Sequence, residues 1–337
     1  MTSNKTLSYF KSFEEKILGQ DVLDFEAVAF DLFLFQAKQN PVYKEYLGYL
    51  GIDPAKVSSI DAVPFLPIAF FKNQDVVSAP IETFKGFFSS SGTSGMVTSK
   101  HHIWSVEFYQ KHCLSLFEME YGPIQNFHVL ALLPSYLERQ GSSLVSMVDF
   151  LIKKSDSPDS GFYLYDHGKL AEKIDFLKDG NRKILLIGVT FALLDFAESG
   201  FQIPKTDKLI VMETGGMKGR RREMVREEVH AQLSNAFQVK GIHSEYGMTE
   251  MSSQAYSKGN GVYTFPHTTG VYLRDTNDPF SRSERAHGGL NVIDLANFHS
   301  CAFLETQDLG RVGKDGKIEI LGRLDNSEIR GCNLMLN

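Results

Sequence analysis

The sequence predicts an α/β fold built on a largely parallel sheet, followed by a smaller antiparallel or barrel-like part. Between residues 126 and 235, continuous apolar runs alternate with longer helical patterns, which is typical of buried parallel strands joined by helices. Beyond about Gly259 the pattern changes to short strands separated by Gly and Asp turns. The 337 residues, 42% of them hydrophobic, are enough for one large domain or two moderate ones.

The first fifty residues are predicted to be helical. Apolar residues recur at helical spacing in "LSYFKSFEEKIL" and "DVLDFEAVAFDLFLFQAKQ". Asn40 and Pro41 supply the cap and the first-turn residue of a further short helix. From Val57 to Pro80 the chain is interrupted by prolines, and an extended conformation is predicted there.

The elements that follow are predicted from the alternation itself. The predicted strands are "NFHVLALLP", "GFYLYDH", "KILLIGV" and "KLIVMET", and the predicted helices are "GSSLVSMVDFLIKKS", "GKLAEKIDFLKDG", "TFALLDFAES" and "GRRREMVREEVHAQLSN". Short strands are predicted at "GGLNVIDL", "CAFLE" and "GKIEILG" in the last part of the chain.

Composition excludes several classes of protein. The net charge of −6 provides no basic surface, so we expect no nucleic-acid partner. The three cysteines, without CxxC spacing, favour neither a disulfide framework nor a zinc site. The first residues have no apolar signal-peptide core, and no apolar run reaches membrane-spanning length. A cytoplasmic protein without a membrane span is expected.

The most unusual stretch is "FSSSGTSGMVTSK", residues 88–100. Its glycines, Gly92 and Gly95, let the backbone fold closely around an anion, and Ser, Thr and backbone donors can hold phosphates. The GxxxxGK[ST] pattern of a Walker A loop is absent. An ordinary flexible turn is the alternative, because Ser/Gly-rich loops are common.

Three later segments carry groups suited to a nucleotide. In "HSEYGMTEMSS", Tyr246 offers a ring for stacking on a base, Thr249 a hydroxyl and Glu250 an oxygen ligand for Mg²⁺. In "METGGMKGRRRE" the adjacent glycines let the chain pass close to a planar ligand. Asp308 follows a strand, where a carboxylate can hold a ribose diol. Each segment taken alone is equally compatible with a polar loop or a plain turn.

Taken together and in this order, the segments resemble the adenylate-forming superfamily of acyl-CoA synthetases, peptide-synthetase adenylation domains and luciferases. "SSSGTSG", "ETGGMKG", "YGMTE", "ETQDLG" and "GRLDNSEIRG" are similar to five of its motifs. Within it, "VPFLPIAFFK", "LLPSYLERQGSSLV" and "LGRLDNSEIRGCNLML" resemble the acyl-protein synthetase (LuxE-type) family.

The resemblance implies the large N-terminal domain of such an enzyme, with layered strand–helix sheets and a small β subdomain, but without the usual small C-terminal domain. Residues 1–321 would form the AMP-binding domain, with a helical segment at 1–55 and a β-rich part at about 260–321. Residues 322–337 would hold the hinge motif and a short tail.

The resemblance also implies roles for individual residues. Thr249 would contact the α-phosphate of ATP, Glu250 would bind Mg²⁺, and Asp308 would hold the ribose with help from Arg323. The hinge residue would be Asp325. The remaining nucleotide-binding residues would be Ser90, Ser91, Gly92, Thr93, Ser94 and Gly95 around the β- and γ-phosphates, and Gly215, Gly216, Tyr246 and Gly247 around the adenine.

Two departures from the superfamily pattern bear on the chemistry. The superfamily loop has a lysine shortly after its second glycine, whereas "MVTS" precedes Lys100 here. The C-terminal domain that normally supplies a catalytic lysine is also expected to be missing. Lys100, His101 and the arginines of "KGRRRE" are candidates for the replacing cation.

The implied reaction joins a carboxylic acid to AMP and then to a thiol. The resemblance implies that Cys332, near the end of the chain, is acylated and passes the acyl group to a partner reductase. A carrier protein and CoA are alternative acceptors, and Cys113 and Cys301 are expected to be core residues. The 26 phenylalanines suit a lining for a fatty or an aryl acid, but most belong in the core.

The predicted function is therefore ATP-dependent and Mg²⁺-dependent activation of a carboxylic acid, with a long-chain fatty acid as the expected substrate. The alternatives are an aryl-acid CoA ligase of the phenylacetate type and a non-catalytic nucleotide-binding subunit of a reductase complex. Retention of Thr249, Glu250 and Asp308 together favours an enzyme, because an idle pocket needs no ligands for metal and ribose.

Overall fold

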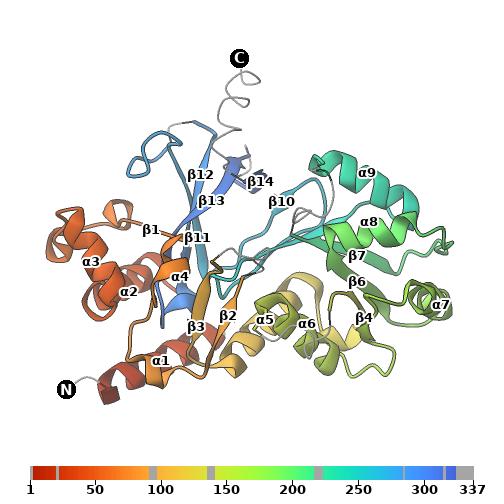
Figure 1. The fold of residues 1–337 in the computed structure, drawn as a ribbon, viewed down its shortest axis with the longest axis horizontal. Helices are drawn as coiled ribbons and strands as arrows, with labels where there is room; N and C mark the ends of the chain where they lie inside the picture. Colours follow the sequence, from red (N-terminus) through yellow and green to blue (C-terminus); the bar gives the residue numbers. More distant parts are fainter. Residues whose placement is uncertain are drawn as a thin grey trace. The chain divides into compact units, whose positions relative to one another are not determined.

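The fold was derived from a computed structural model. It describes residues 3–19, 23–90, 97–134, 141–215, 222, 224–283, 285–313 and 316–323. Contacts between residues divide the chain into two compact units (Figure 1). Unit 1 contains the described residues within 1–108, 249–253 and 264–337, and unit 2 contains those within 109–248 and 254–263.

Unit 2 is organised around the predicted parallel sheet. Its strand order is β5-β4-β6-β7-β8-β9, in which β9 alone runs antiparallel to its neighbour. Every residue of β4 is buried, as expected for a strand covered on both faces. The strands are β4 (Phe127–Leu132), β5 (Gly161–Phe162), β6 (Lys183–Val189), β7 (Leu209–Thr214), β8 (His243–Tyr246) and β9 (Ala255–Ser257), and a short β10 (Val262–Tyr263) follows.

Helices connect these strands as predicted. They are α6 (Ser143–Lys154), α7 (His167–Leu177), α8 (Thr190–Glu198) and α9 (Arg226–Phe237). The helix α5 (Val106–Tyr121) and the 3₁₀ turn η4 (Ile124–Asn126) precede β4. The step from β4 to β5 runs opposite to the later steps along the sheet, so right-handed crossovers place α6 on the other face from α8 and α9. Figure 1 shows α8 and α9 side by side next to β6 and β7.

Two predicted boundaries in unit 2 were wrong. The helix predicted from Gly219 begins at Arg226, and Val225 is its N-cap. The strand predicted across "GFYLYDH" contains only Gly161 and Phe162. It ends there because the next residues turn, with Asp166 N–H donating to the Tyr163 carbonyl, and the Asp166 side chain then caps α7.

Unit 1 contains the predicted antiparallel part. The strands β14-β13-β12-β11 lie in this order, and the short β1 (Leu66–Pro67) pairs in parallel with β13. Their bounds are β11 (Thr269–Arg274), β12 (His287–Asp294), β13 (Phe303–Val312) and β14 (Ile318–Arg323). β13 is longer than the predicted "CAFLE", because its second half pairs with β14.

The N-terminal helices also belong to unit 1. The predicted helices are α1 (Ser3–Leu18), α2 (Phe25–Gln39) and α3 (Pro41–Tyr49). Asn40 caps α3 through its side-chain oxygen, 3.0 Å from the Tyr43 nitrogen, as predicted. The segment predicted to be extended, Val57–Pro80, is interrupted by two short helical turns, η2 (Ile60–Ala62) and α4 (Phe70–Asn73). The turn η1 (Pro54–Lys56) lies just before it and η3 (Ile81–Thr83) just beyond it. This segment is therefore a series of short turns and not a continuous extended chain.

Hydrogen bonds join the helices of unit 1 to the segment between β12 and β13, which includes the 3₁₀ turn η5 (Leu295–Asn297). The Gln36 amide donates to the Asn297 carbonyl at 2.9 Å and accepts from Ala302 N–H at 2.9 Å. Asn40 donates to the Ser300 carbonyl at 3.0 Å. The C-terminal half of the chain thus completes the core that the first helices begin, which explains why unit 1 is discontinuous in sequence.

The serine-rich loop joins the two strands of an antiparallel ribbon. The ribbon consists of β2 (Gly86–Ser89) and β3 (Lys100–Ile103). Within β2, Phe87 is 48% exposed and Phe88 is buried, so one face of the ribbon is covered.

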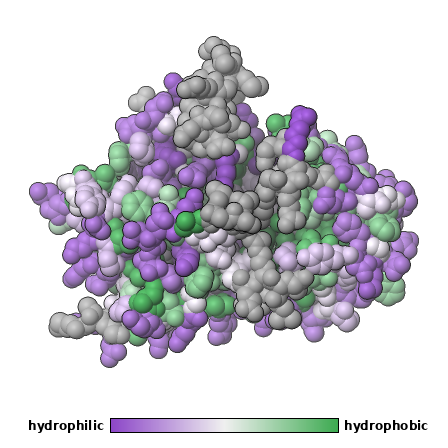
Figure 2. All heavy atoms as spheres, viewed as in Figure 1, coloured by the Kyte–Doolittle hydropathy of each residue, from purple (hydrophilic) through white to green (hydrophobic). Residues whose placement is uncertain are grey.

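Phenylalanine makes a large contribution to both cores. Ten of the largest fully buried side chains in the described residues are phenylalanines: Phe10, Phe33, Phe71, Phe108, Phe117, Phe127, Phe196, Phe237, Phe298 and Phe303. In Figure 2, hydrophilic side chains predominate on the visible face, and hydrophobic ones form small groups.

Candidate functional site

The base of the serine-rich loop is closed by a pair of serines. Ser90 N–H donates to the Ser99 carbonyl at 3.1 Å, and Ser99 N–H donates to the Ser90 hydroxyl oxygen at 2.9 Å. Both bonds continue the β2–β3 ribbon by one residue on each side. The predicted phosphate-binding residues Ser91–Gly95 lie outside the described residues.

Thr249 and Glu250 lie beside this ribbon, in unit 1. The Glu250 side chain is 94% buried from solvent, since its exposed fraction is 6%. Burial raises the pKa of its carboxyl group, whereas a hydrogen bond with the Ser99 side chain and the charges of Arg323 and Lys72 act in the opposite direction. The structure thus places the predicted metal ligand next to the base of the predicted phosphate loop.

His101 lies on β3, two residues beyond Ser99, and forms a hydrogen bond with the main chain of Thr249. Its Nδ1 lies 2.9 Å from the Thr249 carbonyl oxygen, and since a carbonyl can only accept, Nδ1 carries the proton. Full burial lowers the pKa of His101 to about 4, despite the Thr249 carbonyl. His101 is therefore neutral near pH 7, which removes it from the candidate cations.

A buried carboxylate fixes the residues that follow Glu250. Asp294 accepts from the backbone N–H groups of Ser252 and Ser253 at 2.8 and 2.9 Å. Asn297 donates to the Glu250 carbonyl at 2.7 Å and accepts from the Ser252 hydroxyl at 2.6 Å. Burial raises the pKa of Asp294 in spite of these bonds. Residues 250–253 are thereby held against the segment that contains Asp294 and Asn297.

Sequence reasoning missed Asp294, Asn297, Ser99 and Lys72. The sequence offered one signal: Asp294 follows an apolar strand, and an aspartate in that position often starts a turn. Its side chain does accept a hydrogen bond from Ala296 N–H at 3.1 Å. Nothing in the spacing indicated its partners, which are more than forty residues away.

The predicted ribose ligand and its partner are neighbours in the antiparallel sheet. Asp308 on β13 pairs with Arg323 on β14, and Arg323 Nε lies 4.0 Å from Asp308 Oδ1. The Arg323 side chain is 76% exposed, whereas that of Asp308 is 13% exposed. The buried Arg274 donates to the Thr306 carbonyl at 2.6 Å, and its charge interacts with Asp308 and Glu305.

In unit 2, the ends of two adjacent parallel strands bring the other predicted residues together. Thr214 on β7 pairs with Glu245 on β8, so Gly215 and Tyr246 follow at the same edge of the sheet. Gly215 has a φ of +67°, which favours glycine, and its carbonyl accepts from the Thr190 hydroxyl. The Thr190 hydroxyl also lies 2.9 Å from Glu213 Oε2.

Gly247 is a glycine for lack of space. A Cβ at this position would lie 2.6 Å from Glu245 Oε1, and the other Glu245 oxygen accepts from the Thr214 hydroxyl. Tyr246 makes an edge contact with Tyr263, with ring centroids 5.9 Å apart. Gly216 lies outside the described residues.

The cysteines of the described part are core residues, as predicted. Cys113 and Cys301 are fully buried, and burial raises the pKa of Cys301 to about 12. Neither is a suitable nucleophile. Cys332 and Asp325 lie outside the described residues.

The described residues contain no group of three His, Cys, Asp or Glu side chains that could hold a metal ion. Glu250 alone fits an ion that arrives with a phosphate chain, because Mg²⁺ is usually held by one or two carboxylates together with substrate phosphates and waters. Its burial favours this, since a cation would stabilise a carboxylate that is desolvated. No helix within the described ranges is long and apolar enough to cross a membrane.

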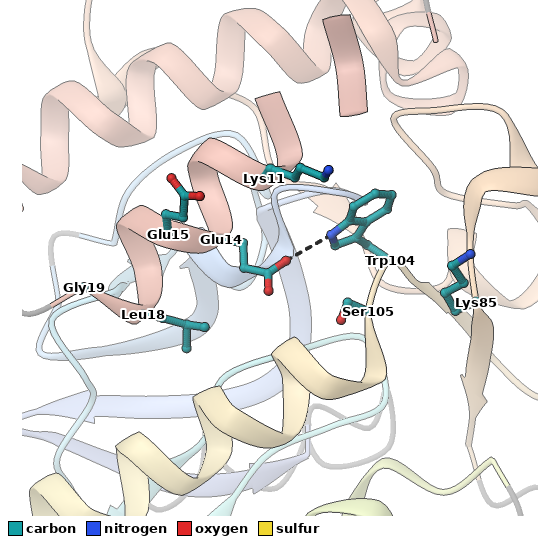
Figure 3. Close-up of a pocket in the computed structure, with 8 residues that line it drawn as sticks. All are labelled: Lys11, Glu14, Glu15, Leu18, Gly19, Lys85, Trp104 and Ser105. Carbon is teal, nitrogen blue, oxygen red and sulfur yellow. Dashed lines mark hydrogen bonds between the residues drawn. The ribbon is translucent and has the colours of Figure 1, made fainter. Parts of the chain in front are cut away.

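A pocket of about 550 Å³ lies in unit 1 between α1 and the residues around the ribbon (Figure 3). Trp104, the only tryptophan of the chain, lines it and donates from its indole nitrogen to Glu14 at 3.2 Å. None of the residues predicted for the nucleotide lines this pocket.

A family model described as "Acyl-protein synthetase, LuxE" matches residues 14–337. The chain belongs to this LuxE family. No sequence of a curated protein matches it.

Solved structures show the fold of this LuxE family member. The 2-hydroxyisobutyryl-CoA ligase in complex with 2-HIB-AMP, in the postadenylation state, matches with a TM-score of 0.65 and 13% identity, covering 93% of this chain and 68% of that chain. The same ligase with 2-HIB-AMP and CoA matches with a TM-score of 0.66 and 14% identity, covering 94% and 69%.

ATP-bound MatB from Rhodopseudomonas palustris matches with a TM-score of 0.50 and 17% identity, covering 73% of this chain and 49% of that chain. The fold is therefore that of the N-terminal part of adenylate-forming ligases, as the sequence motifs predicted.

Proposed function

We propose that this LuxE family member activates a long-chain fatty acid with ATP and transfers the acyl group to a thiol. The observation that carries the proposal is the placement of Glu250 and Thr249 against Ser99 and His101, at the base of the serine-rich loop. A buried carboxyl group and phosphate-binding donors are what ATP with its Mg²⁺ requires.

The first step forms an acyl-adenylate. A carboxylate oxygen of the acid attacks the α-phosphorus of ATP, the bond to the pyrophosphate oxygen breaks, and pyrophosphate leaves. Glu250 would hold Mg²⁺, which when bound neutralises charge along the phosphates. Thr249 would contact the α-phosphate, and donors of Ser90–Gly95 would hold the β- and γ-phosphates.

The remaining predicted ligands would hold the ribose and the adenine. Asp308, with Arg323, would hold the ribose hydroxyls. Gly215, Gly216, Tyr246 and Gly247 would hold the adenine, which suits the tight turn at Gly215 and the lack of room at Gly247. Lys72 and Arg323 are the cations whose charges reach Glu250, so they replace His101 as candidates for stabilising the phosphates.

The second step breaks the mixed anhydride. A thiolate attacks the acyl carbon, a thioester forms, and AMP leaves. The resemblance to the LuxE family implies Cys332 as this thiol, and the burial of Cys113 and Cys301 makes them unsuitable. A partner reductase or carrier protein would then take the acyl group, and CoA is the alternative acceptor.

The test is intact-protein mass and pyrophosphate release after incubation with ATP, Mg²⁺ and a panel of fatty and aryl acids. Wild type and Cys301→Ser should gain an acyl-sized, hydroxylamine-labile mass with long-chain acids. Cys332→Ser should lose the mass but keep acid-dependent exchange of pyrophosphate into ATP. Glu250→Gln should lose both, because the amide is a poor metal ligand.

Other outcomes overturn parts of the proposal. Turnover only when CoA is added, without a protein adduct, identifies a CoA ligase. Turnover with aryl acids alone would show that the substrate is an aryl acid and not a fatty acid. If no acid supports exchange of pyrophosphate into ATP, the protein is a nucleotide-binding subunit that does not catalyse adenylation.

A further inference from the structure

We infer that His101 is a positioning residue of the adenylating site: its Nδ1–H holds the Thr249 carbonyl, and so sets Thr249 and Glu250 against the base of the serine-rich loop. The inference rests on the proposed function. It adds a residue that carries no reacting group of its own.

The first support is the way β3 joins two parts of the site. Ser99 is bonded in both directions to Ser90 across the loop base and also contacts the Glu250 carboxyl group. His101, on the same strand, reaches the Thr249 carbonyl at 2.9 Å. One short strand therefore connects the loop, the Thr249 main chain and the Glu250 side chain.

The second support is the asymmetry of the His101 ring. Nδ1 has a partner, whereas Nε2 is buried and has none among the described residues. Leaving a buried nitrogen unpaired costs free energy, so an apolar ring of similar size would suit this position better if packing were its only task. The bond from Nδ1 is what distinguishes histidine from phenylalanine here.

The third support is the neighbouring ring. His299 stacks on His101 with ring centroids 5.4 Å apart and planes 9° apart, and its own polar neighbour is the backbone of His102 rather than Thr249. Phe71 meets the His101 ring at 89° and 5.5 Å. The ring is held on two sides, which fixes the direction of its Nδ1–H bond.

The bond complements the network on the other side of the segment. Asn297 holds the Glu250 carbonyl, and Asp294 holds the N–H groups of Ser252 and Ser253. Without His101, the Thr249 carbonyl would lose its hydrogen bond to β3, whereas the bonds that hold residues 250–253 would remain. A displacement of about 1 Å at a reacting group can lower a rate about 100-fold.

The experiment compares three substitutions in the full chain. His101→Phe removes the donor and keeps a ring. His101→Asn keeps a donor close to the position of Nδ1. His299→Phe makes the same change in the stacked neighbour, and the bond from His101 to the Thr249 carbonyl is kept. For each variant we would measure kcat and KM for ATP in pyrophosphate exchange, the melting temperature, and hydrogen exchange of the peptide covering residues 248–254.

We expect His101→Phe to lower kcat about 10- to 100-fold with a change in KM of less than about threefold. Its 248–254 peptide should exchange at least about tenfold faster. His101→Asn should restore both values to within about threefold of wild type, and His299→Phe should leave them unchanged.

Three results would overturn the inference: an unaltered kcat in His101→Phe, an equal loss in His101→Asn, or an equal loss in His299→Phe, which would point to packing. If wild type shows no exchange at all, the proposed function fails. Hydrogen exchange of the 248–254 peptide would then still decide whether His101 anchors Thr249.

Discussion

At Glu250, burial and the proposed role as an Mg²⁺ ligand make opposite demands on one side chain. Burial raises the pKa of its carboxyl group, yet Mg²⁺ is bound by a carboxylate. The Ser99 hydrogen bond and the charges of Lys72 and Arg323 favour the ionised form. Burial has a different result at Cys301, which contacts the Phe303 carbonyl but no charged group in the contacts that shift its pKa: the pKa of its thiol rises to about 12 and the side chain is inert.

The chemistry of the thiols follows from this contrast. With Cys332 replaced by serine, two cysteines remain, Cys113 and Cys301, and both are buried. At pH 8, a thiol whose pKa is about 12 has a thiolate fraction roughly 1,000-fold below that of an ordinary cysteine.

We therefore expect the folded Cys332→Ser variant to show no thiol that reacts with Ellman's reagent within minutes, and two reactive thiols after unfolding in guanidinium chloride. Wild type is the control. Rapid reaction of either remaining thiol in the folded variant would show that the core around it opens.

Among the elements, α3 shows how one side chain serves both local and long-range order. The Asn40 oxygen caps the helix at Tyr43 N–H, and its amide nitrogen donates to the Ser300 carbonyl. The Ser300 carbonyl also accepts from the Ser78 hydroxyl at 2.8 Å, so it keeps one partner when Asn40 changes. The start of the helix and the segment before β13 are thus fixed by the same residue.

Replacing Asn40 separates the two contributions. Asn40→Ser should keep the cap and lose the bond to Ser300, and the free energy of unfolding should fall by about 1 kcal/mol. Asn40→Ala should lose both, for a fall of about 2–3 kcal/mol. Urea denaturation followed by circular dichroism would measure the difference, and equal effects of the two substitutions would argue against a capping role.

For the whole molecule, buried ionisable groups make stability depend on pH in two opposing ways. Burial lowers the pKa values of His101 and His299, so these residues stabilise the folded state above pH 6.5, and their contribution is lost as pH falls toward their folded pKa values. Burial raises the pKa values of Glu250, Asp294 and Glu305, so their contribution to stability has the opposite pH dependence. It is present at low pH and is lost as pH rises through the pKa values of the folded state.

A single substitution isolates the histidine contribution. His299→Phe leaves the three carboxyl groups in place and removes one group that must be neutral in the folded state. We expect the loss of unfolding free energy between pH 7 and pH 4.5 to be smaller in the variant, because the unfolded chain no longer gains a proton at a residue that stays neutral in the folded state. Denaturant titrations at both pH values would measure it. An identical pH dependence would mean that His299 is protonated, or reached by water, in the folded protein.

The sequence by itself determined the local elements and the identity of the family. Helical spacing predicted α1 and α2, continuous apolar runs predicted β4, β6 and β7, and Asn40-Pro41 predicted the start of α3, because each pattern depends only on neighbouring residues. The ordered motifs likewise predicted adenylate-forming chemistry, which the family match and the fold support.

Only the tertiary structure decided which residues hold the site in place. Asp294 binds Ser252 and Ser253 across more than forty residues, and His101 binds Thr249 across nearly 150. The division into two units, with N-terminal helices completing the core of the C-terminal sheet, is equally absent from any local pattern. The physical reason is that a buried polar side chain needs a partner, and the path of the folded chain determines which residue is near enough to be that partner.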